Sequence, residues 1–223
     1  MLIEPIIKGV IAKSAHPLGC QEAVKKQIKF VKNAPQIKDG PKRVLIIGAS
    51  SGFGLAARIA VTFGGAKADT IGVSFERGPN ENSLGSAGWY NNIYFKKEAE
   101  REQRTAINIV GDAFSLDTRS QVVEAIETYF EGEVDLIIYS LATGVRPKSG
   151  SDEFWRSAIK PIGESVTGAT ISLEDDNWVT NTLEAATKEE AESTLKVMGG
   201  EDWEHWIDEL INTESIAPGC KTI

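Results

Sequence analysis

The stretch RVLIIGASSGFGLAARIA, residues 43–60, decides the fold. Residues 43–47 form a short apolar run rich in β-branched side chains, which is typical of a parallel strand buried on both faces. Gly48, Gly52 and Gly54 follow, and a helix begins near Phe53. A strand, a glycine-rich turn and a helix in this order predict a Rossmann-type motif that binds a dinucleotide.

The three glycines have different expected roles. Gly48 lets the chain turn sharply out of the strand, Gly52 lets the backbone approach a pyrophosphate, and Gly54 lets the helix pack against the sheet. The N-terminus of the helix would present free N–H groups to the pyrophosphate. The alternative is a glycine-rich turn without a ligand, and the flanking strand and helix make it the weaker interpretation.

The same alternation of strand and helix continues along the chain. We expect further strands at residues 70–75, 106–110 and 134–139, and helices at 53–63, 89–104 and 118–130, the last with Asp117 as its N-cap. This order predicts an α/β fold with a parallel sheet and right-handed crossovers. Before it, residues 2–11 are expected to be extended and residues 19–33 to form an amphipathic helix that buries Val24, Ile28 and Val31.

The pattern lapses over residues 142–186, apart from a small hairpin expected near residues 166–173. Helices are predicted at 188–197 and 201–211, and a new strand begins at 221–223. We therefore expect one domain over residues 1–223, with an N-terminal extension (1–39), a core (40–141) and an insertion and substrate-side segment (142–223). We expect it to be incomplete at the C-terminus, so the fourth strand would leave an open sheet edge and the isolated chain would aggregate.

Composition narrows the class of partner. The net charge of −8 disfavours nucleic acid and anionic lipid as partners. No apolar run is long enough to span a membrane, and the N-terminus lacks the pattern of a signal peptide. Two cysteines make no disulfide framework, so a cytoplasmic location is expected. His16 and His205 have no ligands at metal-binding spacing, and no metal site is expected.

Two kinds of surface residue have a simple structural interpretation. Residues 174–176 are acidic but lack the pattern of a calcium loop, so they are expected to form a solvated turn. Trp178, Trp203 and Trp206 are expected to be core or interface aromatics and not a stacking platform.

Candidate cofactor residues follow the other strands. Glu76 lies after the second strand, where an acid hydrogen-bonds the adenosine ribose and repels a 2′-phosphate, so it favours NAD(H). The positive charge of Arg77, next to Glu76, weakly favours NADP(H) instead. Asp112 follows the third strand. It would either hydrogen-bond adenine or only form a turn. Ser140 follows the fourth strand. It would either lie in the crevice where the ligand binds or only mark the end of the strand.

Several stretches together resemble one family, the trans-2-enoyl-CoA reductases with the similar single-chain NADH-dependent enoyl-acyl-carrier-protein reductases. The resemblance runs from residue 1 to residue 223 with the motifs in family order. The stretches are HPLGC (16–20), GPKRV (40–44), GASSGFGLA (48–56), GVSFE (72–76), GWYNN (88–92), GDAFS (111–115), YSLA (139–142) and VMGGEDW (197–203).

The resemblance implies an enlarged short-chain-dehydrogenase-like fold and NADH-dependent reduction of the C2–C3 double bond of a trans-2-enoyl thioester in fatty-acid metabolism. It implies a monomeric complete enzyme whose substrate is an enoyl-CoA or an enoyl-acyl-carrier-protein. The implied cofactor-binding residues are Gly48, Ala49, Ser50, Ser51, Gly52 and Phe53 at the pyrophosphate, Phe75 and Glu76 at the adenosine ribose, Asp112 and Ala113 at adenine, and Ser140 and Leu141 beside the nicotinamide.

This chain departs from the family in two ways. Thr143-Gly144 stand where the family has a small residue and a proline. The family is also nearly twice as long, and its catalytic Tyr-x8-Lys pair is expected beyond Ile223, so no catalytic residue is assigned within the chain. Tyr139 and Lys148 have the same spacing, but Tyr139 belongs to an apolar strand and Lys148 to a polar loop, so we interpret the spacing as coincidence.

Two other functions fit part of the sequence. A non-catalytic dinucleotide-binding module would explain the absence of the Tyr-x8-Lys pair. An ordinary short-chain alcohol dehydrogenase is disfavoured because no Tyr-x-x-x-Lys occurs in the chain.

Overall fold

A computed structural model describes residues 7–8, 11–12, 14–172 and 175–223. The chain divides into two compact units. Among the described residues, the first contains Ser14–Leu141 and His205–Ile223, and the second contains residues 7–8, 11–12 and those of Ala142–Glu204. Most of the extended element expected at residues 2–11 lies outside the described residues; within it, β1 (Ile7–Lys8) pairs with β2 (Ile11–Ala12).

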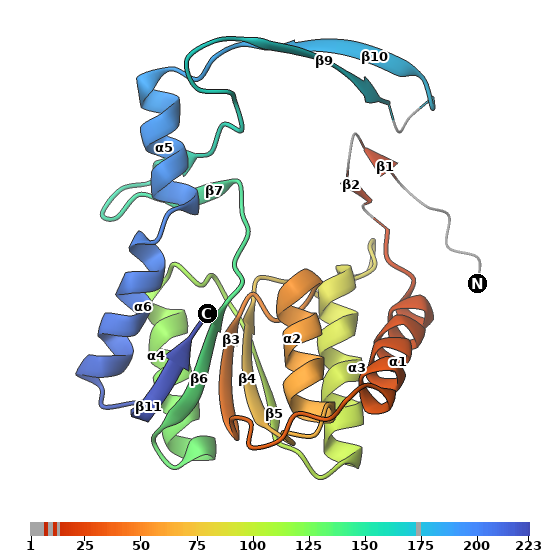
Figure 1. Ribbon diagram of the computed structural model, residues 1–223, viewed down its shortest axis with the longest axis vertical. Coiled ribbons are helices and arrows are strands. Elements are labelled where there is room, and N and C mark those ends of the chain that lie inside the picture. The colour runs from red at the N-terminus through yellow and green to blue at the C-terminus, as the bar shows by residue number, and fades with distance from the viewer. Residues whose placement is uncertain (1–6, 9–10, 13, 173–174) are drawn as a thin grey trace. The chain divides into compact units, whose positions relative to one another are not determined.

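A five-stranded parallel sheet forms the centre of the first unit (Figure 1). Its strands run in the spatial order β5-β4-β3-β6-β11, so the chain moves outward from β3 in one direction and then crosses to the other side. Their bounds are β3 (Arg43–Ile47), β4 (Asp69–Ser74), β5 (Ala106–Val110), β6 (Val134–Tyr139) and β11 (Ile216–Thr222). The predicted Rossmann-type parallel sheet is confirmed.

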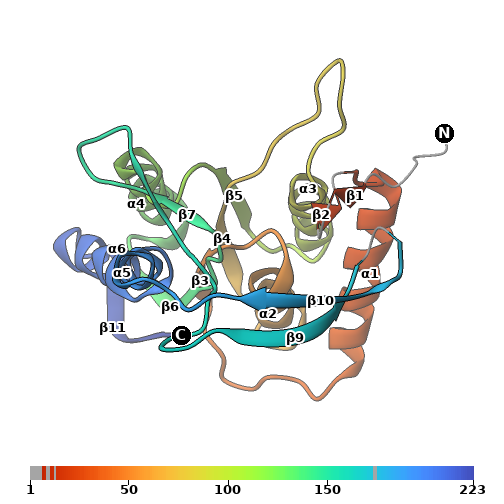
Figure 2. The ribbon, with the colours of Figure 1, turned by 90° about the horizontal axis from the view of Figure 1, so that it is seen from above.

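Helices cover both faces of this sheet (Figures 1 and 2). On one face, α2 (Gly52–Phe63) and α3 (Ala87–Arg101) pack on the strands, and α1 (Pro17–Asn33) lies against both helices. On the other, α4 (Leu116–Phe130) and α6 (Glu201–Asn212) contribute Val122, Ile126, Trp206 and Leu210 to the core. Coverage of both faces explains why residues 44–47 are fully buried and apolar.

Among the described residues of the second unit are the β1–β2 hairpin, two further hairpins and helix α5. β7 (Val145–Pro147) pairs with β8 (Phe154–Arg156), and both contact α5 (Lys188–Met198). β9 (Val166–Ile171) pairs with β10 (Trp178–Leu183), and all twelve of their residues are exposed. The sequence predicted a smaller hairpin at residues 166–173 and no hairpin at β7–β8, because these strands lack a regular apolar alternation.

Three other expectations are corrected. The N-cap of α4 is Ser115, whose hydroxyl accepts the Thr118 N–H at 3.1 Å, and Asp117 lies inside the first turn. The last strand starts at Ile216 and pairs with β6, so the edge of β6 is not open and that reason for aggregation is wrong. Of the tryptophans expected in the core or at an interface, Trp206 is buried in the core, whereas Trp178 is 74% exposed and so is not a core residue.

A buried arginine ties α2 to the sheet. Arg58 has no exposed surface, and its guanidinium donates to the Thr70 hydroxyl at 3.0 Å, to Asn108 Oδ1 at 2.7 Å and to the Ile107 carbonyl at 2.8 Å. Its charge also lies 4.3 Å from the centre of the Phe95 ring. Burial lowers the pKa of Arg58 to about 9, so it remains a cation at neutral pH.

Replacing Arg58 with alanine should destabilise the chain by at least about 3 kcal/mol, because it leaves buried acceptors unpaired and opens a cavity. Urea unfolding of the two proteins measures this difference. Arg101→Ala is the matched control, because Arg101 is exposed and its ion pair with Glu98 joins neighbouring turns of α3, so its loss should cost no more than about 0.5 kcal/mol. Equal midpoints for Arg58→Ala and Arg101→Ala would contradict the assignment.

Candidate cofactor site

The glycine loop lies where the strand order reverses, between the carboxyl ends of β3 and β6. The N–H groups of Gly48 and Ala49 both donate to the Val73 carbonyl at 2.9 Å, and the Ser140 N–H donates to the Ile47 carbonyl at 2.8 Å. The loop is therefore anchored to β4 on one side, while β6 is anchored to β3 on the other. In open α/β sheets, ligands bind at this reversal point.

Two of the three glycines are fixed by close contacts. Gly48 has φ +90°, and a Cβ there would lie 2.3 Å from the Ser140 carbonyl oxygen. A Cβ on Gly54 would lie 2.0 Å from the Gly48 carbonyl oxygen. Any side chain at either position would force the loop, α2 and the end of β6 apart.

Gly52 differs, because the space above it is open. Its φ is +54°, and a Cβ there would meet no atom within 4 Å. Ser51 occupies the N-cap position of α2 without making a side-chain cap hydrogen bond. The first N–H groups of α2 therefore lie beside this open space, called the Gly52 cradle below, and their polarity fits a pyrophosphate.

The other expected cofactor residues lie at the same edge of the sheet, since they follow β4, β5 and β6. Phe75 is 81% exposed, while the neighbouring Glu76 is half-buried and accepts a hydrogen bond from the Ser50 hydroxyl at 2.5 Å. Asp112 accepts the Phe114 N–H at 3.0 Å, which is the turn-forming role the sequence left open for it. Ala113 is buried, and Leu141 packs against the core.

The start of α3 completes this region; GWYNN (88–92) was noted as a family motif, but no cofactor role was predicted for it or for Ser86. Ser86 donates its hydroxyl to the second carboxylate oxygen of Glu76, and Asn91 donates to the Ser50 carbonyl at 2.9 Å. A serine just before a helix and a glycine inside its first turn were the available signals. They were missed because residues 77–88 look like an ordinary glycine- and asparagine-rich loop.

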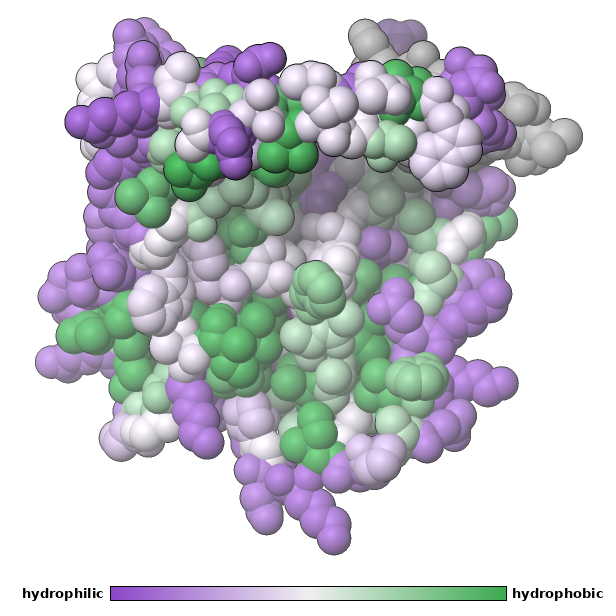
Figure 3. All heavy atoms as spheres, turned by 45° about the horizontal axis from the view of Figure 1, so that its top comes forward, coloured by the Kyte–Doolittle hydropathy of each residue, from purple (hydrophilic) through white to green (hydrophobic). Residues whose placement is uncertain are grey.

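Apolar residues also reach the surface of the first unit. Phe53, Phe75 and Leu116 are 89%, 81% and 72% exposed. Figure 3 shows green apolar residues among the purple hydrophilic ones on the face in view. Because these three residues stand at or near the carboxyl ends of β3, β4 and β5, this part of the surface suits a ligand with flat, partly apolar rings.

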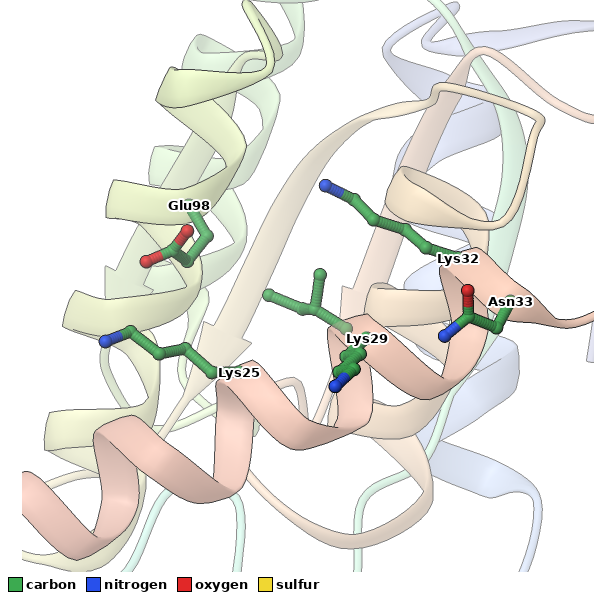
Figure 4. A pocket seen from close by; sticks show the side chains of 6 residues that line it. Lys25, Lys29, Lys32, Asn33 and Glu98 are labelled. Carbon is green, nitrogen blue, oxygen red and sulfur yellow. The ribbon is translucent and has the colours of Figure 1, made fainter.

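A depression beside α1 and α3 is unrelated to this site. It is lined by Lys25, Ile28, Lys29, Lys32 and Asn33 of α1 and by Glu98 of α3 (Figure 4). None of these residues belongs to the loops at the carboxyl ends of the strands. Two of the lysines form exposed ion pairs, Lys25 with Glu22 and Lys32 with Glu102.

Tyr139 and Lys148 each make contacts that are unrelated to acid–base catalysis. Tyr139 ends β6 and packs against the core of the first unit. Lys148 belongs to the second unit, where its ammonium group lies 2.6 Å from Glu153 Oε2 and 4.4 Å from the centre of the Trp155 ring.

His16, in the first of the quoted motifs, has a structural role. Its Nδ1 accepts the Gly19 N–H at 3.2 Å and so caps α1. Within the described ranges, no three His, Cys, Asp or Glu side chains are grouped so that they could hold a metal ion. No helix in that part of the chain has the length and apolar character needed to cross a bilayer.

Comparison with family models decides the relationship. Residues 2–81 match the "NAD(P)H binding domain of trans-2-enoyl-CoA reductase", and residues 83–223 match the "Trans-2-enoyl-CoA reductase catalytic region". The chain belongs to the trans-2-enoyl-CoA reductase family. The resemblance found in its motifs is thereby confirmed.

Individual relatives agree. The chain is 76% identical over 223 residues to an enoyl-[acyl-carrier-protein] reductase [NADH] of Vibrio parahaemolyticus and 49% identical over 224 residues to a trans-2-enoyl-CoA reductase [NADH] of Clostridium beijerinckii. Each match covers the whole chain but 56% of the relative, so the chain spans about half the length of these relatives.

Two solved structures share the fold. A trans-2-enoyl-CoA reductase from Clostridium acetobutulicum in complex with NADH superposes with a TM-score of 0.94 at 42% identity, covering all of this chain and 55% of that one. The corresponding structure from Treponema denticola, in complex with NAD, gives 0.90 at 40% identity, covering all of this chain and 56% of that one.

Replacing Gly52 with valine should abolish NADH binding, because the side chain would fill the open cradle. Left-handed backbone also strains a branched residue, so we expect a loss of stability of roughly 1–2 kcal/mol. Gly150→Val is the matched control, since Gly150 also has positive φ and open space around it but lies in the second unit. Titration with NADH and thermal melting of both variants separate binding from strain; normal NADH affinity in folded Gly52→Val would refute the cradle.

Proposed function

We propose that this chain supplies the dinucleotide-binding part of an NADH-dependent enoyl-thioester reductase of fatty-acid metabolism. The observation that carries the proposal is the open cradle at Gly52, in front of the uncapped N-terminus of α2 and beside a firmly held Glu76. Family membership and the NADH in the names of relatives support it. An enoyl-CoA and an enoyl-acyl-carrier-protein are both candidate substrates, since relatives are named for each.

Each part of the chain would contribute to holding the cofactor. Residues 48–53 would hold the pyrophosphate, with Gly52 and the α2 N–H groups nearest to it. Phe75 and Glu76 would hold the adenosine ribose, Asp112 and Ala113 would lie at adenine, and Ser140 and Leu141 would flank the nicotinamide. NADH, when bound, supplies the hydride that adds to C3 of the enoyl thioester, while a proton adds to C2.

The chain's own role in this reaction is placement. A hydride added at C3 leaves enolate charge on the thioester oxygen, which a hydroxyl donor must stabilise. The resemblance assigns that hydroxyl, with a lysine that positions the nicotinamide ribose, to a Tyr-x8-Lys pair outside residues 1–223. A non-catalytic binding module is the less favoured function, because residues 83–223, more than half of the chain, match a region described as catalytic. We also infer a cytoplasmic location, which the free thiols of Cys20 and Cys220 support.

The wild-type protein should bind NADH more tightly than NADPH. Replacing Glu76 with alanine should narrow that difference, because it removes a fixed negative charge from the position of the 2′-phosphate, and Glu76→Lys should narrow it further. Glu81→Gln is the matched control, since Glu81 is exposed in the following loop. Calorimetric titration with both cofactors measures the ratio; equal affinities in the wild-type protein would refute the role of Glu76.

Residues 1–223 expressed alone should not reduce crotonyl-CoA at a useful rate. Losing one donor to an oxyanion costs about 100- to 1,000-fold in turnover, and the missing lysine should add to this. NADH oxidation is followed beside the full-length Clostridium beijerinckii relative as positive control. A rate near that of the control would show that the catalytic residues lie within this chain, and Tyr139→Phe and Lys148→Ala would then be tested first.

A further inference from the structure

The carboxylate of Glu76 is held by two hydroxyls from different parts of the chain. The Ser50 hydroxyl of the glycine loop donates to Oε1 at 2.5 Å, and the Ser86 hydroxyl, just before α3, donates to Oε2. An ionised carboxylate has about four acceptor positions. Two therefore remain for the hydroxyls of a ribose while the side chain stays in place.

The first turn of α3 packs against this carboxylate, so the carboxylate cannot move toward the helix. A Cβ on Gly88 would lie 2.0 Å from Glu76 Oε1 and 2.7 Å from the Ser50 hydroxyl. The glycine thus permits the close approach of Glu76 and α3. The carboxylate of Glu76 therefore lies against the backbone of α3 at Gly88, which limits its movement on that side.

Ser86 contributes to Glu76 and not to its own helix. It occupies the N-cap position of α3, where a serine oxygen usually accepts an N–H from the first turn, but it makes no such bond. Its oxygen accepts the Arg77 N–H at 3.2 Å, and its hydroxyl donates to Glu76, with the Arg77 carbonyl as a second, longer acceptor at 3.3 Å. The geometry of this serine serves the acid that follows β4.

The same helix also fixes the other partner of Glu76. Asn91 donates to the Ser50 carbonyl at 2.9 Å, and buried Asn92 donates to the Ser74 hydroxyl at 2.9 Å. Ser50 is itself buried, and Ser74 ends the strand that leads to Glu76. The N-cap and the first two turns of α3 therefore hold the glycine loop, the end of β4 and Glu76 together.

We propose that Ser86, acting with Ser50, is a positioning residue that sets the preference for NADH over its 2′-phosphorylated counterpart, by preventing Glu76 from turning away. This inference rests on the proposed function. A glutamate free to change rotamer could move aside for a phosphate, whereas a confined carboxylate remains where the phosphate would be. Confinement before binding also removes an ordering cost when ribose binds.

The test uses ADP-ribose and 2′-phospho-ADP-ribose, which differ only by the phosphate and lack the nicotinamide, so no residue outside the chain is needed at the ring. Calorimetry on the 223-residue chain measures the dissociation constant of 2′-phospho-ADP-ribose divided by that of ADP-ribose, a ratio that is high when the phosphate is rejected. Ser86→Ala should lower this ratio by roughly threefold to tenfold, the effect of losing a hydrogen bond of about ordinary strength. Ser86→Thr, which keeps the hydroxyl, should restore it.

Controls separate positioning from folding. Ser83→Ala should leave the ratio unchanged, because Ser83 contacts Arg77 and Asn80 in the same loop but not Glu76. Thermal melting should change little in Ser86→Ala, because this hydroxyl does not cap α3. In a Glu76→Gln background, Ser86→Ala should not lower the ratio further.

Each outcome has a distinct meaning. An unchanged ratio in Ser86→Ala, or an equal fall in the Glu76→Gln background, would overturn this inference and leave the proposed function intact. Failure of the folded wild-type chain to bind ADP-ribose at all would instead count against the proposed function.

Discussion

The backbones at Gly48 and Ser140 approach so closely that no side chain fits between the end of β3 and the end of β6. This contact joins two parallel strands at the point where the order of the sheet reverses. Gly54 then seats α2 on the Gly48 carbonyl, so the direction of the helix follows from the same contact. Gly52 lies in open space, whereas Gly48 and Gly54 are in close contact with backbone atoms.

The sequence was most informative where one physical requirement dominates. Strands buried on both faces must be largely apolar, and β3 and β6 have the bounds that this rule predicted. The bounds of β5, an edge strand, were also predicted correctly. The order of strands and the glycine loop followed from the same patterns. In contrast, β7 to β10 are short or fully exposed, so no apolar periodicity marks them, and β11 is interrupted by Pro218 and Gly219.

The candidate site was predicted only in part, for a related reason. Residues after strands could be found because every parallel strand delivers its carboxyl end to the same edge. Ser86, Gly88 and Asn91 come from a helix, and their importance depends on contacts between segments up to 41 residues apart. The two family models meet near residue 82, between β4 and α3, so the hydroxyls that hold Glu76 come from both models.

The buried guanidinium of Arg58 also limits how the sequence can diverge. A Cβ on Gly72 of β4 would lie 2.5 Å from Arg58 Nη1 and 2.7 Å from the Cβ of Ala49, so the small size of residue 72 reflects occupied volume and not backbone conformation. Positions 49, 58 and 72 therefore share one fixed volume, and a larger residue at one requires a smaller residue at another. In an alignment of relatives, these three positions should covary as a set, and a lineage that loses the arginine should be the one in which the glycine is free to change.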